Sequence, residues 1–488
     1  MHGDWRFGLH GLARRMGRER RLKNMPAQTV LINPDENGAS IQRRAADYQP
    51  SRSWRTWLIG RPLPTADAPH QTIGKFVGLA VFASDALSST AYATQEILFI
   101  LAAAGVGAFT YAFPIAIVIV SLLAIVTLSY WQIIHAYPGG GGAYIVARDN
   151  LGERAAQVAG AALLTDYVLT VAVSISSGVA QITSAFPTLY AHRIEIAVGL
   201  VAFMTVVNLR GVRESGAAFA IPSYFFLVMM FLTVGVGLMR YLSGTLGVVA
   251  DPPPLEIESL QAISLFLILH AFSSGTTALT GVEAISNGIT AFREPRSRNA
   301  GITLVSMSVI LGTLFFGITF LAGPSGAIPS EHETVISQLA RVVFDGRGAL
   351  YFGVIAATMI ILAMAANTSF NGFPRLSALL GQDGFLPRQL AFRGSRLVYS
   401  RGIVALAVVA CLLIIVFRAS VTGLIPLYAI GVFLSFTLAQ AGMARRWLKS
   451  GRLQTAQVVR ERGSTLHFER GWQIKMVVNG FGALCTTG

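Results

Sequence analysis

Ten long apolar segments follow one another along this chain, and they restrict its fold more than any other feature. They cover residues 74–103, 109–135, 155–185, 194–209, 217–242, 261–291, 302–322, 348–369, 403–417 and 420–443. About 20 apolar residues in a helix cross a bilayer, whereas barrel strands alternate apolar and polar residues over about 10 positions. Charged residues make up only 13% of the chain, which is about half of what a soluble domain carries. The sequence therefore predicts an all-α polytopic membrane protein and excludes a soluble or a disordered chain.

Basic residues gather on one side of the predicted membrane. With the N-terminus in the cytoplasm, all but five of the 38 Lys and Arg residues fall in cytoplasmic segments, as the positive-inside rule requires. The five exceptions are Arg193, Arg240, Arg341, Arg347 and Arg418. We therefore expect a multi-pass protein of the bacterial cytoplasmic (inner) membrane. The orientation of the chain in the lipid bilayer then explains its net charge of +14, and no nucleic-acid partner is expected.

The segments that flank the ten spans carry separate expectations. Residues 1–73 are rich in Arg, Pro, Asn and Asp, which is typical of a basic, mostly disordered cytoplasmic tail; both Met1 and Met25 are candidate starts. Residues 444–488 are expected to form a cytoplasmic loop and then a partial eleventh helix. A chain terminus at membrane depth is costly, so we expect a truncated form of a longer protein.

Two spans are unusually long and polar at their centres. The first span is polar over residues 84–90, and the sixth is polar over residues 273–283. Broken helices at corresponding positions of two halves are typical of secondary transporters with inverted repeats. The predicted five-helix repeats are residues 74–242 and 261–443. Close packing through small residues is the alternative, but packing does not explain the acids in these spans.

Three acidic residues lie deep in the predicted spans: Asp85, Asp166 and Glu283, while Glu96 lies nearer the outer end of the first span. A lone acid at the centre of a bilayer costs several kcal/mol unless it has a partner or a function. No Lys or Arg lies deep in any span. The acids therefore predict a bound cation, a transferable proton, or both.

Hydroxyl groups accompany each acid at helical spacing. The sets are Asp166 with Thr170 and Ser174, Thr280 with Glu283, and, if the first span is helical there, Asp85 with Tyr92. Residues three or four positions apart lie on one face of a helix. Carboxylate, hydroxyl and carbonyl oxygens are hard ligands that suit alkali or alkaline-earth ions.

The organisation and one loop of this chain resemble the amino acid–polyamine–organocation superfamily. The loop follows the second span and reads Tyr137-Pro138-Gly139-Gly140-Gly141-Gly142-Ala143-Tyr144. The resemblance covers residues 74–443 and implies a LeuT-type pair of inverted five-helix repeats with discontinuous helices 1 and 6. Amino acid permeases usually carry a Gly-Ser-Gly break in the first span. Here Asp85 stands in that segment, where it would attract a cation and repel a carboxylate.

Three strings narrow the resemblance to the KimA-type potassium importers, which are related to the Kup potassium uptake family. They are Ala83-Ser84-Asp85-Ala86-Leu87-Ser88-Ser89, Leu164-Thr165-Asp166-Tyr167-Val168-Leu169-Thr170 and Thr280-Gly281-Val282-Glu283. This resemblance implies proton-coupled potassium import, with Glu283 as the proton-coupling acid and no cofactor. The implied ion path consists of Asp85, Tyr92, Asp166, Tyr167, Thr170, Ser174, Thr280 and Tyr428, and potassium itself would bind at Asp85, Asp166, Thr170 and Thr280. It also implies a homodimer, with cyclic di-AMP control in a longer form.

Other classes of function stay open at this point. An amino acid or polyamine permease keeps the fold and changes the cargo, and competition by putrescine would favour it. A sensor or scaffold with the same fold would gain nothing from buried acids. The sequence shows no P-loop, no metal box and no nucleophile–base pair in a plausible setting, so we do not expect an enzyme.

Overall fold

The computed structural model describes residues 32–34, 40–42, 73–210, 216–255, 261–394, 398–455 and 457–487. The chain divides into two compact units, Met1–Leu63 and Pro64–Gly488. In the first unit, strands β1 (Ile32–Pro34) and β2 (Ser40–Gln42) pair antiparallel, with Ile32 opposite Gln42. The predicted disorder of the N-terminal tail falls almost wholly outside the described residues.

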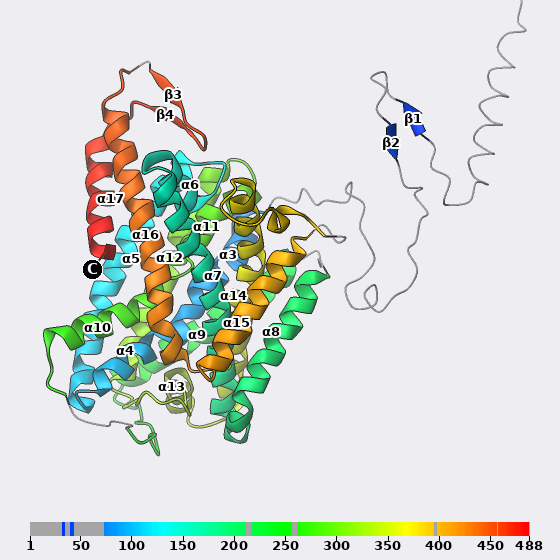
Figure 1. The fold of residues 1–488 in the computed structure, drawn as a ribbon. Coiled ribbons are helices and arrows are strands. Elements are labelled where there is room, and N and C mark those ends of the chain that lie inside the picture. The colour runs from blue at the N-terminus through cyan, green and yellow to red at the C-terminus, as the bar shows by residue number, and fades with distance from the viewer. Residues whose placement is uncertain are drawn as a thin grey trace, which may run out of the picture. The chain divides into compact units, whose positions relative to one another are not determined.

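The second unit is a bundle of helices (Figure 1). Its first part contains α3 (Lys75–Ser88), η2 (Ser89–Ala91), α4 (Ala93–Ala102), η3 (Val106–Tyr111), α5 (Ala112–Ala136), α6 (Gly142–Asn150), α7 (Glu153–Ala185), η4 (Pro187–His192), α8 (Arg193–Leu209) and α9 (Gly216–Leu242). Its second part contains α10 (Leu265–Gly275), η5 (Thr276–Leu279), α11 (Ala284–Asn287), η6 (Ile289–Ala291), α12 (Arg296–Ala322), α13 (Val335–Val343), α14 (Ala349–Gln382), η7 (Arg388–Ala391), α15 (Ser400–Val416) and α16 (Val421–Gly451). The hairpin strands β3 (Val458–Arg460) and β4 (Thr465–His467) and helix α17 (Trp472–Thr487) follow.

The helices have the length and composition of a multi-pass membrane protein. Within the described residues, nine helical segments are long and apolar enough to cross a membrane, and α15 is a shorter apolar helix. Large apolar side chains stay exposed on the outside of the bundle, as on α15 at Val404, Val408 and Leu412. Such faces suit lipid rather than water. A mostly helical membrane protein is therefore confirmed.

Helix α7 runs through the middle of the bundle and is rich in small residues. It packs against α14, α16 and α6. We call the end of the bundle with α6 and the β3–β4 hairpin the α6 end, and the opposite end with η4 and α13 the α13 end (Figure 1). Helix α17 lies along α16 and α5, where the buried Asn479 accepts a hydrogen bond from Ser129 at 2.6 Å.

Both polar spans are interrupted. The first changes from α3 through the short 3-10 turn η2 to α4, and Tyr92 stands at the junction. The sixth changes from α10 through η5 to a non-helical stretch before α11, in which Thr280 is extended and Gly281 has a φ of 82°. The break in the first span therefore lies a few residues later than the centre of the polar string. Neither Asp85 with Tyr92 nor Thr280 with Glu283 lies on one continuous α-helix, so the helical-spacing argument is wrong for these two sets.

The two interruptions contact each other directly. The Ser89 hydroxyl donates to the Ala278 carbonyl at 3.1 Å. Gly281 lies so close to α3 that an added Cβ would stand 2.5 Å from the backbone nitrogen of Ala86. A positive φ and this close approach both require glycine there. The polar centres of the first and sixth spans are thereby held together inside the bundle.

Candidate functional site

The site is built on the regular part of α7. Asp166, Thr170 and Ser174 are spaced by four residues on this continuous helix and are each at most 2% exposed. Because the helix is unbroken there, the three side chains share one face, as their spacing predicts. Ser174 lies one turn closer to the α13 end than Thr170.

Hydroxyl groups from four parts of the bundle meet beside this face. The hydroxyls of Thr170 and of Tyr428 on α16 are 3.0 Å apart. The Tyr92 hydroxyl, from the break in the first span, lies within hydrogen-bonding reach of Tyr428 and Thr280. The broken spans, α7 and α16 therefore contribute one connected chain of hydroxyl oxygens, and all four of its members are buried.

The three deep acids converge at the same place. The carboxyl groups of Asp166 and Glu283 lie within hydrogen-bonding reach of each other, and Asp85 interacts electrostatically with both. Each acid is at most 4% exposed. Two carboxyl groups can share a hydrogen bond only when one of them carries a proton. We call the three acids, with Thr170, Thr280, Tyr92 and Tyr428, the central site.

The central site has no basic counterpart among the described side chains. No ion pair there includes Asp85, Asp166 or Glu283. One oxygen of Asp166 and one of Glu283 lack any hydrogen-bond partner. Buried oxygens of this kind are costly unless a cation or a proton occupies them.

The local backbone of the sixth span positions Glu283. Its carboxylate lies within hydrogen-bonding reach of the backbone N–H groups of Gly281 and of Glu283 itself. Both donors become free because the chain is not helical at this point. The interruption thus leaves two backbone N–H groups close to the acid.

Tyr167 lies apart from the chain of hydroxyls. Its hydroxyl accepts a hydrogen bond from Asn287 on α11 at 3.2 Å. Its ring lies against α14, where a Cβ on Gly372 would come within 2.6 Å. Tyr167 therefore connects α7 to α11 and α14 in this structure rather than to Tyr92 or Tyr428.

Sequence reasoning missed two residues near the central site. Tyr130 on α5 is fully buried, its hydroxyl has no partner among the described residues, and it interacts electrostatically with Glu283 and Asp166. Asn287 supports Tyr167. Asn287 could have been noticed because it follows Glu283 by four residues, but nothing in the second span distinguishes Tyr130 from an ordinary packed aromatic residue.

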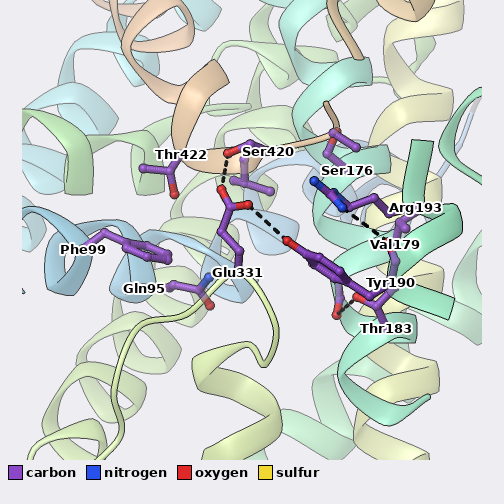
Figure 2. A pocket seen from close by; sticks show the side chains of 13 residues that line it. Gln95, Phe99, Ser176, Val179, Thr183, Tyr190, Arg193, Glu331, Ser420 and Thr422 are labelled. Carbon is purple, nitrogen blue, oxygen red and sulfur yellow. Dashed lines mark hydrogen bonds between the residues drawn. The ribbon is translucent and has the colours of Figure 1, made fainter. Parts of the chain in front are cut away.

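A small cavity is lined by side chains of α4, α7, η4 and α16 and by Glu331 of the loop before α13 (Figure 2). Its volume of about 30 Å³ has room for one or two water molecules. Glu331 on that loop accepts hydrogen bonds from Ser420 at 2.5 Å and from Tyr190 at 3.4 Å. Gln95 bonds to the same loop through Ser330 and Val335. The loop is therefore tied to α4, to η4 and to the beginning of α16.

The comparisons with known proteins agree with this architecture. The amino acid permease family model matches residues 74–487, so this chain is a multi-pass membrane protein of the amino acid permease family. Over 432 residues it is 46% identical to the potassium transporter KimA of Bacillus subtilis (strain 168), which covers 88% of this chain and 68% of KimA. The chain belongs to the KimA-type branch of the family.

A more distant relative has another cargo. The low-affinity putrescine importer PlaP of Escherichia coli (strain K12) is 25% identical over 285 residues, which is 55% of this chain and 59% of PlaP. Both relatives are transporters, so this protein is a transporter and not an enzyme.

Proposed function

We propose that this protein imports potassium by proton symport across a bacterial inner membrane. The observation that carries the proposal is the Asp166–Glu283 carboxyl pair beside Asp85, which has no basic partner among the described residues. The 46% identity to a protein named as a potassium transporter supports the choice of cargo. A buried group of acids favours a cation over an amino acid carboxylate.

Potassium would bind between Asp85, Asp166, Thr170 and Thr280. Carboxylate and hydroxyl oxygens replace part of the water that surrounds the ion in solution. Tyr428 would orient the Thr170 hydroxyl, 3.0 Å away, and Tyr92 lies close to Thr280. The acids provide the charge, and the hydroxyls provide neutral ligands that are already in position.

The carboxyl pair would couple the ion to a proton. A proton on Glu283 leaves Asp166 ionised and able to hold potassium, so the central site carries ion and proton together. If Glu283 lost its proton while the site was empty, three carboxylates would repel one another in a medium of low dielectric. An outward-facing site therefore favours taking up a proton together with the ion before it turns inward, and it releases both before it returns.

Alternating access would come from the broken spans. In this proposal α3–α4 and α10–α11 belong to two inverted five-helix repeats and move against α7 and α14 around the fixed site. The α6 end faces the cytoplasm, because most Lys and Arg residues that flank the spans lie on that side. The implied homodimer and its cyclic di-AMP control stay predictions of the resemblance.

Rubidium-86 uptake into cells that lack their own potassium uptake tests this function. We expect uptake that excess potassium blocks and that excess sodium and putrescine do not. Asp166→Asn should abolish uptake while the protein stays in the membrane at the wild-type level. No rubidium uptake from well-expressed wild-type protein would contradict the proposal, and block by putrescine would favour a polyamine permease.

A further inference from the structure

We propose a second cation site between the cavity and the central site, formed by Glu96, Thr422 and Ser176. This inference rests on the proposed function, because it assumes that potassium is the cargo. Potassium would bind there on its way from the α13 end to Asp85 and Asp166. The site would be the first place where the ion meets a buried negative charge.

Glu96 has the features expected of a cation ligand. It lies on α4, one turn after Tyr92, and is 0% exposed. One carboxylate oxygen accepts a hydrogen bond from Thr422 at 3.1 Å, and the other has no partner among the described residues. None of the ion pairs in that part of the chain includes Glu96. An unpaired carboxylate at this depth is costly unless a proton or a cation occupies it.

Thr422 connects Glu96 to the cavity. It lines the cavity from the first turn of α16 (Figure 2), and its hydroxyl donates to Glu96. Ser176 of α7 lines the same cavity, is 1% exposed, and its hydroxyl has no hydrogen-bond partner in the described residues. An ion in the cavity would therefore meet two hydroxyls first and the carboxylate behind them.

The three residues also lie on the elements that build the central site. Glu96 follows Tyr92 on α4, Thr422 precedes Tyr428 on α16, and Ser176 follows Thr170 on α7. The same three elements therefore present oxygen atoms at two levels. The second level lies closer to the α13 end and adjoins the cavity. Continuous oxygen ligands along one set of helices are what a desolvated ion needs in order to move between sites.

The charged groups at the rim of the cavity do not neutralise Glu96. Arg193 donates to the backbone carbonyls of Arg418 and Tyr190, and its guanidinium stands over the Tyr190 ring at 4.2 Å. Glu331 is engaged by Ser420 and Tyr190, so its negative charge adds to that of Glu96. Arg193 lines the same cavity, and its positive charge opposes that of Glu331, so the attraction for a cation behind the cavity comes from Glu96.

A different role for Glu96 would be purely structural, as a permanently protonated acid that holds Thr422. The two roles differ in how they respond to Glu96→Gln. Glutamine keeps the shape and a neutral acceptor for Thr422, so a structural acid would be replaced without loss. A cation ligand would lose its charge, and the affinity for the ion would fall while the later steps stay intact.

Rubidium-86 uptake measured over a range of rubidium concentrations separates these outcomes. For Glu96→Gln we expect KM to rise about tenfold, the loss of one charged ligand, with Vmax within twofold of wild type. Thr422→Val, which removes the hydroxyl and keeps the shape, should raise KM about threefold. The matched control is Glu195→Gln, an exposed acid at the same end, which should leave KM unchanged.

The result that overturns the second site is a wild-type KM in both Glu96→Gln and Thr422→Val. If Glu96→Gln is missing from the membrane, Thr422→Val alone decides. Failure of the proposed function looks different, because wild-type protein would then take up no rubidium at all.

Discussion

The α6 end and the central site both bury charged groups, and only at the α6 end are the buried charges paired within the described residues. At the α6 end, Arg446 is 3% exposed and donates to Glu461 at 2.8 Å, while Lys449 donates to the other oxygen of Glu461 at 3.1 Å. Arg446 also donates to Ser464 and to the Thr465 carbonyl. In the central site, by contrast, three acids have no cation among the described residues.

The paired charges of the α6 end suit a structural role, whereas the unpaired acids of the central site suit the proposed transport role. The paired charges fasten the β3–β4 hairpin to the end of α16, and removing one partner leaves the other buried and unpaired. The unpaired acids gain nothing for stability, since each raises the cost of folding. Substitutions should therefore have opposite effects in the two regions: they lower stability at the α6 end and lower transport at the centre.

The largest expected effect on transport outside Asp166 belongs to Glu283. Glu283→Gln keeps the hydrogen bond to Asp166 but removes the exchangeable proton, so an imposed pH gradient should no longer drive rubidium uptake. We expect gradient-driven uptake to fall by more than tenfold, with a melting temperature in detergent no lower than that of wild type. Normal uptake with an unchanged response to the gradient would remove the coupling role.

The largest expected effect on stability belongs to Arg446. Arg446→Gln leaves Glu461 with Lys449 as its cationic partner, so the cost of breaking a buried pair, about 3–5 kcal/mol, is the upper limit of the expected loss. Thermal unfolding of the purified protein measures this loss. The control is Arg462→Gln, whose pair with Glu153 is long, at 3.9 Å, and mostly exposed, so about 0–1 kcal/mol is expected. Equal melting temperatures for the two variants would erase the contrast between the regions.

A smaller effect concerns Asp149, an incompletely neutralised acid of the α6 end. Its carboxylate accepts a hydrogen bond from the Gly463 N–H at 2.9 Å, yet burial raises the pKa of Asp149 above the ordinary 3.8. An acid whose pKa is higher in the folded state loses stability as the pH rises through its ordinary pKa to the raised one. Asp149→Asn should therefore raise the melting temperature slightly, by less than about 2 °C, at pH 7.

Below the ordinary pKa the carboxyl is neutral in both the folded and the unfolded states, so wild type and Asp149→Asn should melt alike there. Unfolding scans at pH 2.5, more than one unit below the ordinary pKa, and at pH 7 test this difference. A gain of equal size at both pH values would mean that the effect has nothing to do with the charge of Asp149.

Much of this architecture could be predicted from the sequence because its signals are local. Apolar length predicts spans, and polar strings predict interruptions, wherever they occur. The face of Asp166, Thr170 and Ser174 followed from the constant period of a regular helix. The same period wrongly predicted one shared helix face for Thr280 and Glu283, because Gly281 has a positive φ and the chain is not helical there.

The remaining features depend on contacts between distant segments, for which the sequence carries no local signal. Tyr130 reaches the carboxyl pair only because α5 packs beside the sixth span. In the sequence, Arg446 cannot be distinguished from the other basic residues near it. In the structure, it pairs with an acid that lies 15 positions further along the chain, beyond a turn. Helical spacing does not describe either relationship.

The contact between the two interrupted spans has a kinetic consequence. Moving one interruption without the other would break the hydrogen bond from Ser89 to Ala278 and separate Gly281 from the α3 backbone. That would leave a carbonyl unpaired in a dry interior, which costs about 1–3 kcal/mol. In the proposed alternating access, the two broken spans therefore turn together, with one degree of freedom instead of two. States in which only one of them has turned would be correspondingly rare, and a leak through such a half-turned state would be suppressed.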